Sequence, residues 1–371
     1  MSLLIILLVP LLLAAWLYLW RRRVAPRIAV SMAVSSASLP YGRHTDLTVR
    51  LINPARLPAP HVVCTFVLPD GLQLVPPGHP DEDDARMRKC RVALGLGPRQ
   101  ETDATFRVYG CRRGRQAVTK CSLVLGDGLT SREIAATRET SVEVVVHPRL
   151  LSESRSVAIA QQRFGTSSMR RKLYATSLDW INIRAYQPGD AFRDIAWPLT
   201  ARRGELVVLE RAPSIERRVV FLLNAQVNET HWRHNSAPVN RIYEEALAAA
   251  VRLMSEYTHL TVHTNAVWRR RTKGQRYPAI EFCGLGQAQV ARQLGHWLGG
   301  LSTYAETGFV RAVERVGGLL AQPCEVVVFT AYDDEPLQHA YARLRRRGHH
   351  VSVLAVAAGD GPGTGEAGGV L

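Results

Sequence analysis

The run R-V-V-F-L-L at residues 218–223 decides the fold class of the C-terminal half of the chain. Five consecutive apolar residues without alternation are typical of a strand that is buried on both faces of a parallel sheet. A second such run, E-V-V-V-F-T, follows at residues 325–330. Helical patterns alternate with these runs, at residues 240–257, 287–301 and 335–347. With Asn240 as the cap of the first helix, this order predicts a doubly wound α/β domain over residues 217–358.

The region before it has a different periodicity. Between residues 27 and 150, short alternating runs such as L-T-V-R-L at 47–51 are separated by Pro, Gly and Asn turns. This spacing predicts an antiparallel β-sandwich, and residues 151–216 connect the sandwich to the α/β domain. The tail at residues 359–371 contains six glycines and is expected to be disordered. The predicted fold class is therefore a multi-domain α+β chain.

The N-terminus adds a further expectation. From Leu3 to Trp20 the chain carries no charge, and 18 residues of helix extend about 27 Å, close to the thickness of a bilayer core. Three arginines follow, at residues 21–23. This pattern predicts a single transmembrane helix within residues 1–23, in the cytoplasmic membrane, with the later domains on the cytoplasmic side. A cleaved signal peptide is the alternative, but it requires positive charge before the apolar run.

Composition excludes several functional classes. The formal net charge is +15, but the positive charge is almost entirely arginine and is distributed along the chain without interleaved aromatic residues. We therefore expect no nucleic-acid partner. The six cysteines show no C-x-x-C spacing, and the chain has no G-x-S-x-G, H-E-x-x-H or Walker motif. These absences favour a protein that is not an enzyme, with no cofactor and no small-molecule substrate.

The most specific stretch is the connector, where R-A-Y-Q-P-G-D at residues 184–190 precedes R-D-I-A-W-P-L-T-A-R at 193–202. Proline and glycine form a turn, Asp190 is expected to cap a short helix, and Trp197 is expected to be a packing anchor. Two interpretations stay open. The connector is either a salt-bridged docking element or a hydrolase site that uses Asp190, Asp194 and Arg202 at an interdomain cleft. The second requires a carboxyl pKa raised by burial.

These residues resemble the signature of the bacterial domain of unknown function 58 family. The matching positions are Arg184, Tyr186, Gly189, Asp190, Arg193, Asp194, Trp197 and Arg202. Weaker similarity extends upstream to R-G-R at residues 113–115 and V-V-H-P at 145–148. The resemblance implies a membrane segment, a β-rich middle region and an α/β domain similar to the von Willebrand factor A fold. It also implies no established enzymatic activity and a protein partner, a MoxR-type AAA+ ATPase.

A von Willebrand A-like domain raises the question of a metal-ion-dependent adhesion site. Such a site needs Asp-x-Ser-x-Ser after the first strand, whereas this chain has Asn224, Gln226 and Asn228. Thr330 and Asp333 follow a later strand and are interpreted as remnants of the site or as helix caps. The sequence thus predicts a degenerate site without metal. The resulting hypothesis is a membrane-anchored, non-catalytic interaction or scaffold protein, with a hydrolase as the alternative.

Overall fold

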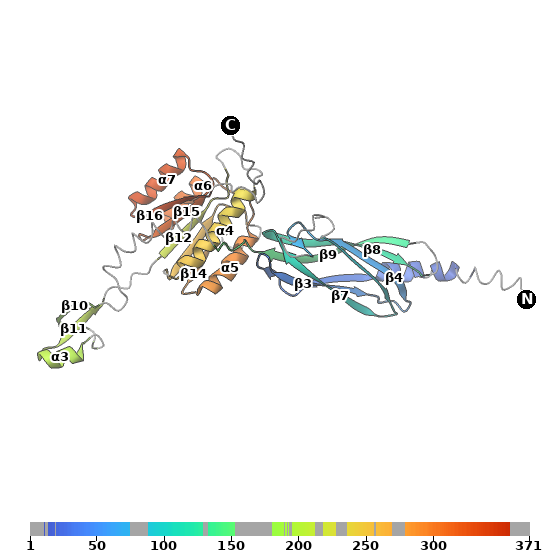
Figure 1. Cartoon of the computed structure of the whole chain (residues 1–371), viewed down its shortest axis with the longest axis horizontal. Coiled ribbons are helices and arrows are strands. Elements are labelled where there is room, and N and C mark those ends of the chain that lie inside the picture. Colours follow the sequence, from blue (N-terminus) through green and yellow to red (C-terminus); the bar gives the residue numbers. More distant parts are fainter. Residues whose placement is uncertain are drawn as a thin grey trace, which may run out of the picture.

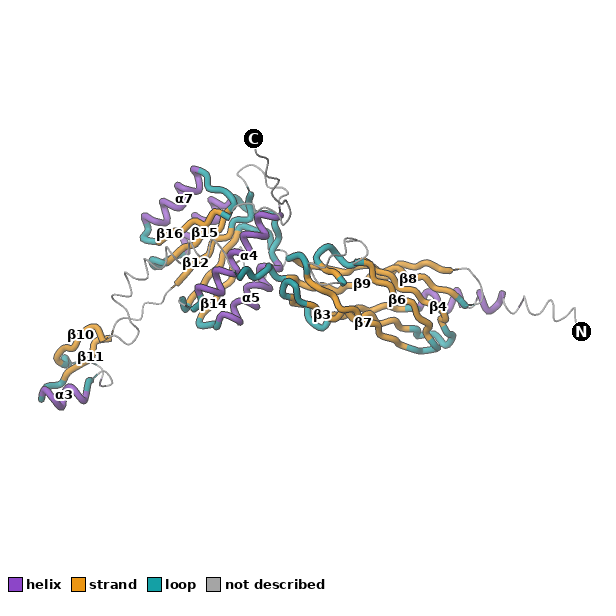
Figure 2. The backbone as a smooth tube through the Cα atoms, in the orientation of Figure 1, coloured by secondary structure: helices purple, strands orange, loops and turns teal. Residues whose placement is uncertain are grey.

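The computed structural model describes most of the chain (Figure 1). The described residues are 11, 14–18, 20–74, 88–128, 133–152, 180–188, 190, 192, 195–211, 218–227, 236–255, 257–268 and 279–356. A β-rich domain and an α/β domain lie next to each other along the long axis of the molecule, as the distribution of strands and helices in Figure 2 also shows. The glycine-rich tail lies outside the described residues.

Two sheets enclose the core of the β-rich domain. The first has the order β1 (Ala29–Val34), β3 (His44–Ile52), β7 (Glu101–Gly110) and β5 (Leu72–Gln73). The second has the order β2 (Ser38–Leu39), β9 (Glu133–Val146), β8 (Gly114–Gly126), β4 (Ala59–Val67) and β6 (Lys89–Leu96). Burial alternates along β3, as expected for a strand with one face on the core. The second sheet is mixed because β2 pairs with β9 in parallel, whereas the other pairs are antiparallel.

The predicted transmembrane helix is wrong. Within the described part of the chain, no helix is long and apolar enough to cross a membrane, and residues 1–10 fall outside that part. Trp20, the last residue of the predicted span, is 1% exposed in the sandwich core together with Val24. Its indole Nε1 donates to the carbonyl of Pro58 at 2.9 Å, just before the short 3-10 helix η1 (Ala25–Arg27). An apolar run that ends in aromatic residues suits a protein core as well as a bilayer, so the pattern does not separate the two.

A five-stranded sheet forms the α/β domain. Its strands lie in the order β14 (Ala279–Cys283), β13 (His259–Thr264), β12 (Arg218–Leu223), β15 (Glu325–Thr330) and β16 (His350–Ala355). Four strands are parallel and β14 is antiparallel at one edge, so this sheet is also mixed. The first strand in sequence, β12, is at the centre of the sheet. The strands β13 and β14 add on one side of it, and β15 and β16 then add on the other, which is the order of a doubly wound sheet.

Helices cover both faces of this sheet. Phe221 of β12 belongs to the core beneath α4 (Ser236–Leu253) and α5 (Gln287–Gly300). Leu222 faces the opposite way, into the core beneath α6 (Phe309–Leu319) and α7 (Glu335–Arg346). The uninterrupted apolar run of β12 is therefore explained by burial on two sides.

The connector forms a small unit of its own. Strands β10 (Trp180–Ala185) and β11 (Val207–Arg211) pair in antiparallel fashion, and α3 (Trp197–Arg203) lies between them in sequence. Gly204 ends α3 with a positive φ of 73°, the left-handed conformation that favours glycine at this position. Figure 1 draws this unit apart from the two larger domains.

Candidate functional site

An ion pair closes the turn of the connector. The guanidinium of Arg184 donates to both carboxylate oxygens of Asp190, at 2.7 and 2.8 Å, and the backbone N–H of Gln187 donates to the same carboxylate at 2.8 Å. These donors, Arg184 above all, lower the pKa of Asp190 to about 2. Asp190 therefore holds the turn together. It does not cap α3, whose N-cap residue is Ala196.

The hydrolase interpretation requires a carboxyl group with a raised pKa, and Asp190 has the opposite shift. Its proposed companion Asp194 lies outside the described residues, as do Gly189 and Arg193. Arg202 is in the last turn of α3, where a cation interacts favourably with the helix dipole, and it is exposed. The described signature residues therefore form a structural turn and an exposed helix.

Large apolar side chains of the connector lie open to solvent. The ring centroids of Tyr186 and Phe192 lie 6.4 Å apart, and Phe192 is 72% exposed. Trp197, the expected packing anchor, is 58% exposed at the start of α3. Ile183 and Leu206 are each more than two-fifths exposed. Exposed aromatic side chains grouped on a small unit are typical of interaction surfaces.

A buried amide network occupies the C-terminal edge of the central strands. Asn224 donates from Nδ2 to the hydroxyl of Thr330 at 3.0 Å, and its Oδ1 accepts from the backbone N–H of Gln226 at 2.9 Å. Asn265 accepts from the backbone N–H of Ala225 at 2.8 Å through Oδ1, and its Nδ2 donates to the Thr307 carbonyl at 3.0 Å. The side chains of this network are neutral and at most 5% exposed.

The polar groups of this network are already hydrogen-bonded within the protein. The Oε1 atom of Gln226 accepts from the Phe309 N–H at 2.7 Å, at the start of α6. Asp333 is exposed, and its neighbour Asp334 is the residue that caps α7, by accepting from the Leu337 N–H. Asn228 lies outside the described part. Within that part, no group of three or more His, Cys, Asp or Glu side chains could hold a metal ion. Neutral amides whose oxygens already accept hydrogen bonds offer little to a divalent cation.

The interface between the two large domains depends on Arg113, in the turn between β7 and β8. Its Nε donates to Asn240 Oδ1 at 2.8 Å, and its Nη1 donates to the carbonyls of Leu298 and Leu301 at 2.6 and 2.9 Å. Asn240 lies inside α4 and binds Arg113, so it is not the helix cap that the sequence predicted. Sequence reasoning missed this contact, although R-G-R at residues 113–115 was part of the resemblance.

A second polar contact crosses the same interface. Ser38 Oγ lies 2.7 Å from His147 Nε2 and 3.1 Å from His296 Nδ1, where Ser38 and His147 come from the sandwich and His296 from α5. Burial, and secondarily His296, lower the pKa of His147 to about 4. His147 is thus neutral at physiological pH, which suits a buried position.

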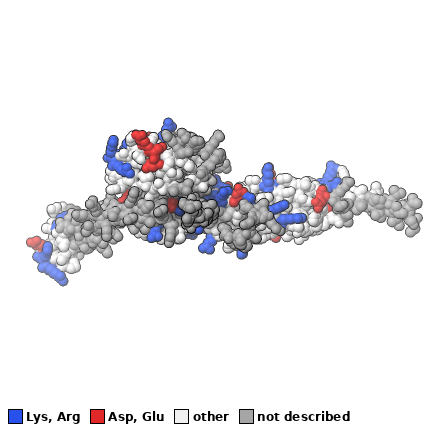
Figure 3. Space-filling view, turned by 45° about the horizontal axis from the view of Figure 1, so that its top comes forward, with Lys and Arg blue, Asp and Glu red and all other residues white. Residues whose placement is uncertain are grey.

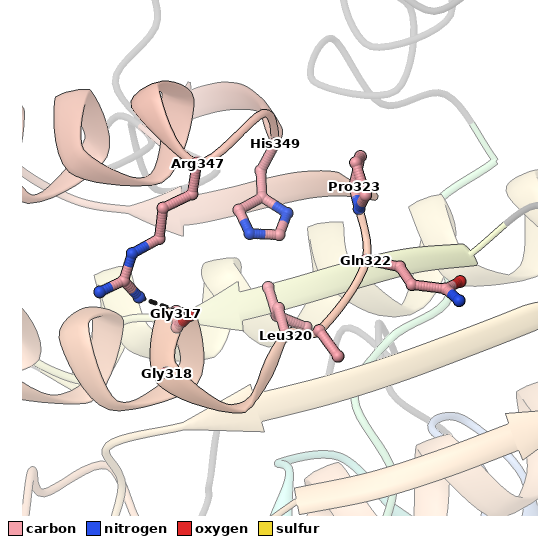
Figure 4. Close-up of a pocket in the computed structure, with 8 residues that line it drawn as sticks. Gly317, Gly318, Leu320, Gln322, Pro323, Arg347 and His349 are labelled. Carbon is pink, nitrogen blue, oxygen red and sulfur yellow. Dashed lines mark hydrogen bonds between the residues drawn. The ribbon is translucent and has the colours of Figure 1, made fainter.

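A cavity of about 440 Å³ lies near the opposite end of the sheet from the amide network (Figure 4). Arg347 donates to the Gly317 carbonyl at 2.7 Å beside it, and His349 Nδ1 lies 3.5 Å from Cys324 Sγ. Burial raises the pKa of Cys324 to about 11. Because the thiol is protonated at neutral pH, this pair is not an activated nucleophile.

On the face shown in Figure 3, the Lys and Arg side chains of the described residues are spread over the connector and both domains.

Comparison with known proteins gives one firm assignment. No curated protein matches the chain. Among solved structures, the CARDB domain of a Pyrococcus furiosus protein in complex with di-metal ions is 12% identical, covers 32% of this chain and 91% of its own, and has a TM-score of 0.22. Native alpha-2-macroglobulin from Escherichia coli is 16% identical over 33% of this chain and 17% of its own, with a TM-score of 0.24. The C-terminal domain of wzt is 10% identical over 37% and 93%, with a TM-score of 0.23.

At TM-scores this low, the similarity to these solved structures says nothing about the fold or function of this chain. The family match is different in kind, because it covers the connector signature and the α/β domain together. Residues 182–361 match the family described as protein of unknown function DUF58, and this part of the chain belongs to that family.

Proposed function

We propose that this chain is a non-catalytic interaction protein, and that its connector binds a partner protein of the MoxR-type AAA+ ATPase class. The observation that carries the proposal is the exposure of Phe192 and Trp197 within the family signature, 72% and 58% respectively. Aromatic residues dominate the binding energy of many protein interfaces because they bury a large apolar area with few rotatable bonds. The choice of ATPase rests on the family resemblance.

The local structure supports this role. The Arg184–Asp190 pair and the Gln187 N–H fix the turn that precedes Phe192. A rigid turn lowers the entropy that a binding segment loses when it docks. The ion pair therefore stabilises the conformation that displays the aromatic rings, and Asp190 has a structural task in this account.

The proposal is tested with the purified full chain and a purified MoxR-type ATPase from the same organism. Size-exclusion chromatography of the mixture, with ATP or ADP present, is expected to show co-elution in one nucleotide state. Independent elution of the two proteins in both states, at concentrations of tens of micromolar, would contradict the proposal. The hydrolase alternative is tested separately with generic ester, peptide and phosphate substrates. Turnover by the wild type that Asp190→Asn abolishes would contradict the non-catalytic assignment.

A further inference from the structure

A groove of about 650 Å³ lies where the sandwich meets the α/β domain. Arg115 contributes to it from β8, and Trp268 and Ile280 contribute from the segment after β13 and from β14. Val145 of β9 also lines the groove, and most of the remaining wall is α5, where Arg292, His296 and Trp297 lie. None of these residues belongs to the connector, so the groove is a separate surface.

The groove has a one-sided charge. Two arginines and a histidine line it, and no Asp or Glu is among its described lining residues. Arg115 is paired with Glu143 at 2.7 Å. Arg292 is exposed and has no acidic partner among the residues that the structure describes. Lining of this composition favours an anionic ligand.

Trp297 lies in the wall of the groove as a largely buried aromatic side chain. The residue is 7% exposed, and its indole Nε1 has no exposed surface. Trp297 therefore offers apolar surface to a ligand, and Trp268 and Ile280 provide more apolar surface in the same groove.

The strand that contributes Ile280 favours a peptide over other anions. Strand β14 is at the edge of its sheet, and among the described strands it pairs only with β13. The outer N–H and C=O groups of an edge strand are a template on which an extended peptide can add as a further strand. Side chains of the added strand alternate, so every second one would face α5.

We propose that the β14 edge and this groove bind an extended segment of a partner protein in which acidic and apolar residues alternate. The acidic side chains pair with Arg292, and the apolar side chains pack on Trp268 and Trp297. This site goes beyond the proposed function, since it needs neither the connector nor an ATPase.

The test uses the full chain, labelled with ¹⁵N, and the probe peptide acetyl-Val-Glu-Val-Asp-Val-Glu-amide. The chain has seven tryptophans, and the Trp297→Phe variant assigns the indole signal of Trp297. Titration is expected to shift that signal in a saturable manner, because Trp297 lines the groove. The neutral peptide acetyl-Val-Gln-Val-Asn-Val-Gln-amide is expected to leave it in place. An oligothymidylate of similar charge is also expected to leave the Trp297 signal in place.

A charge reversal completes the test. Arg292→Glu should weaken peptide binding by about tenfold or more, whereas Arg311→Glu should leave it unchanged. Arg311 is also an exposed arginine, on α6, which covers the other face of the sheet. Three results would overturn the inference: an unmoved Trp297 signal, equal binding by the two variants, or an equal response to the oligonucleotide. None of these results depends on ATPase binding. A negative result for the groove therefore does not contradict the proposed function, and a negative result for ATPase binding does not contradict the groove.

Discussion

The guanidinium carbon of Arg113 lies 4.4 Å from the ring centroid of Tyr243, across the interface between the sandwich and the α/β domain. Tyr243 and Asn240 are three residues apart and so share one face of α4, where Arg113 contacts both. The same guanidinium binds two carbonyls at the C-terminal end of α5, which carries a partial negative charge. One side chain of the sandwich thus joins two helices of its neighbour.

Replacing Arg113 should therefore destabilise the protein. Arg113→Ala removes the guanidinium that donates to the carbonyls of Leu298 and Leu301 and to the amide oxygen of Asn240 at a partly buried place. We expect the free energy of unfolding to fall by about 2–4 kcal/mol, as measured by urea denaturation. Arg107→Ala, at an exposed position on β7, is the control and should change it by less than about 0.5 kcal/mol. Equal stability of the two variants would contradict this role of Arg113.

Two adjacent glycines of α5 provide a matched pair. A Cβ at Gly299 would lie 2.7 Å from the carbonyl oxygen of Val146 in the sandwich, whereas a Cβ at Gly300 would meet nothing within 4 Å. We expect Gly299→Ala to lower the free energy of unfolding by about 1–3 kcal/mol through overpacking. Gly300→Ala should leave it unchanged or raise it, since alanine favours the helix. Thermal denaturation of both variants measures the difference, and tolerance of Gly299→Ala would mean that the domains do not approach so closely.

Stability should depend on pH through His147. Its folded-state pKa of about 4 lies below the ordinary value of about 6.5, so the neutral form is favoured in the fold. The stabilisation is present above about pH 6.5 and is lost as the pH falls towards 4. Between about pH 7 and pH 5 this group should contribute a loss of about 2 kcal/mol in the wild type that is absent in His147→Gln. His350→Gln, at an exposed position, should behave like the wild type. Identical pH profiles for the wild type and His147→Gln would be incompatible with a buried, neutral His147.

Magnesium should not affect stability. The amides of Asn224 and Gln226 are occupied by hydrogen bonds, and no carboxylate stands with them in the described network. Millimolar magnesium is therefore expected to leave the melting temperature unchanged in a thermal scan. A rise of several degrees would reveal a bound ion, because a ligand that binds only the folded state stabilises it.

The strands and helices of the α/β domain were largely predictable. The runs at Arg218–Leu223 and Glu325–Thr330 are β12 and β15 with the expected bounds, because burial on both faces leaves an uninterrupted apolar pattern. The antiparallel edge strand β14 and the helix α6 were missed. The five residues of β14 alternate weakly in burial, and strand direction is not encoded in periodicity.

The candidate sites were less predictable. Asp190 was expected to cap a helix, but its carboxylate closes a turn with Arg184, six residues earlier, because a bidentate arginine is a stronger partner than one backbone N–H. The R-G-R motif at residues 113–115 gave no indication of what Arg113 contacts, since its partners lie more than a hundred residues away in sequence. The apolar N-terminal run led to a wrong prediction of a transmembrane helix. Trp20, at the end of that run, packs in the sandwich, where its indole N–H donates to the carbonyl of Pro58.

The central claim is that the exposed aromatic side chains of the connector bind a partner. The most direct measurement is the dissociation constant of the MoxR-type ATPase for a Phe192→Ser/Trp197→Ser double variant, compared with a Leu319→Ser control. Leu319 is 68% exposed on α6, so the control removes a similarly exposed apolar side chain elsewhere. We expect the double variant to raise the dissociation constant by about 30-fold or more, and the control to leave it unchanged. Equal affinity of the two variants would contradict the claim.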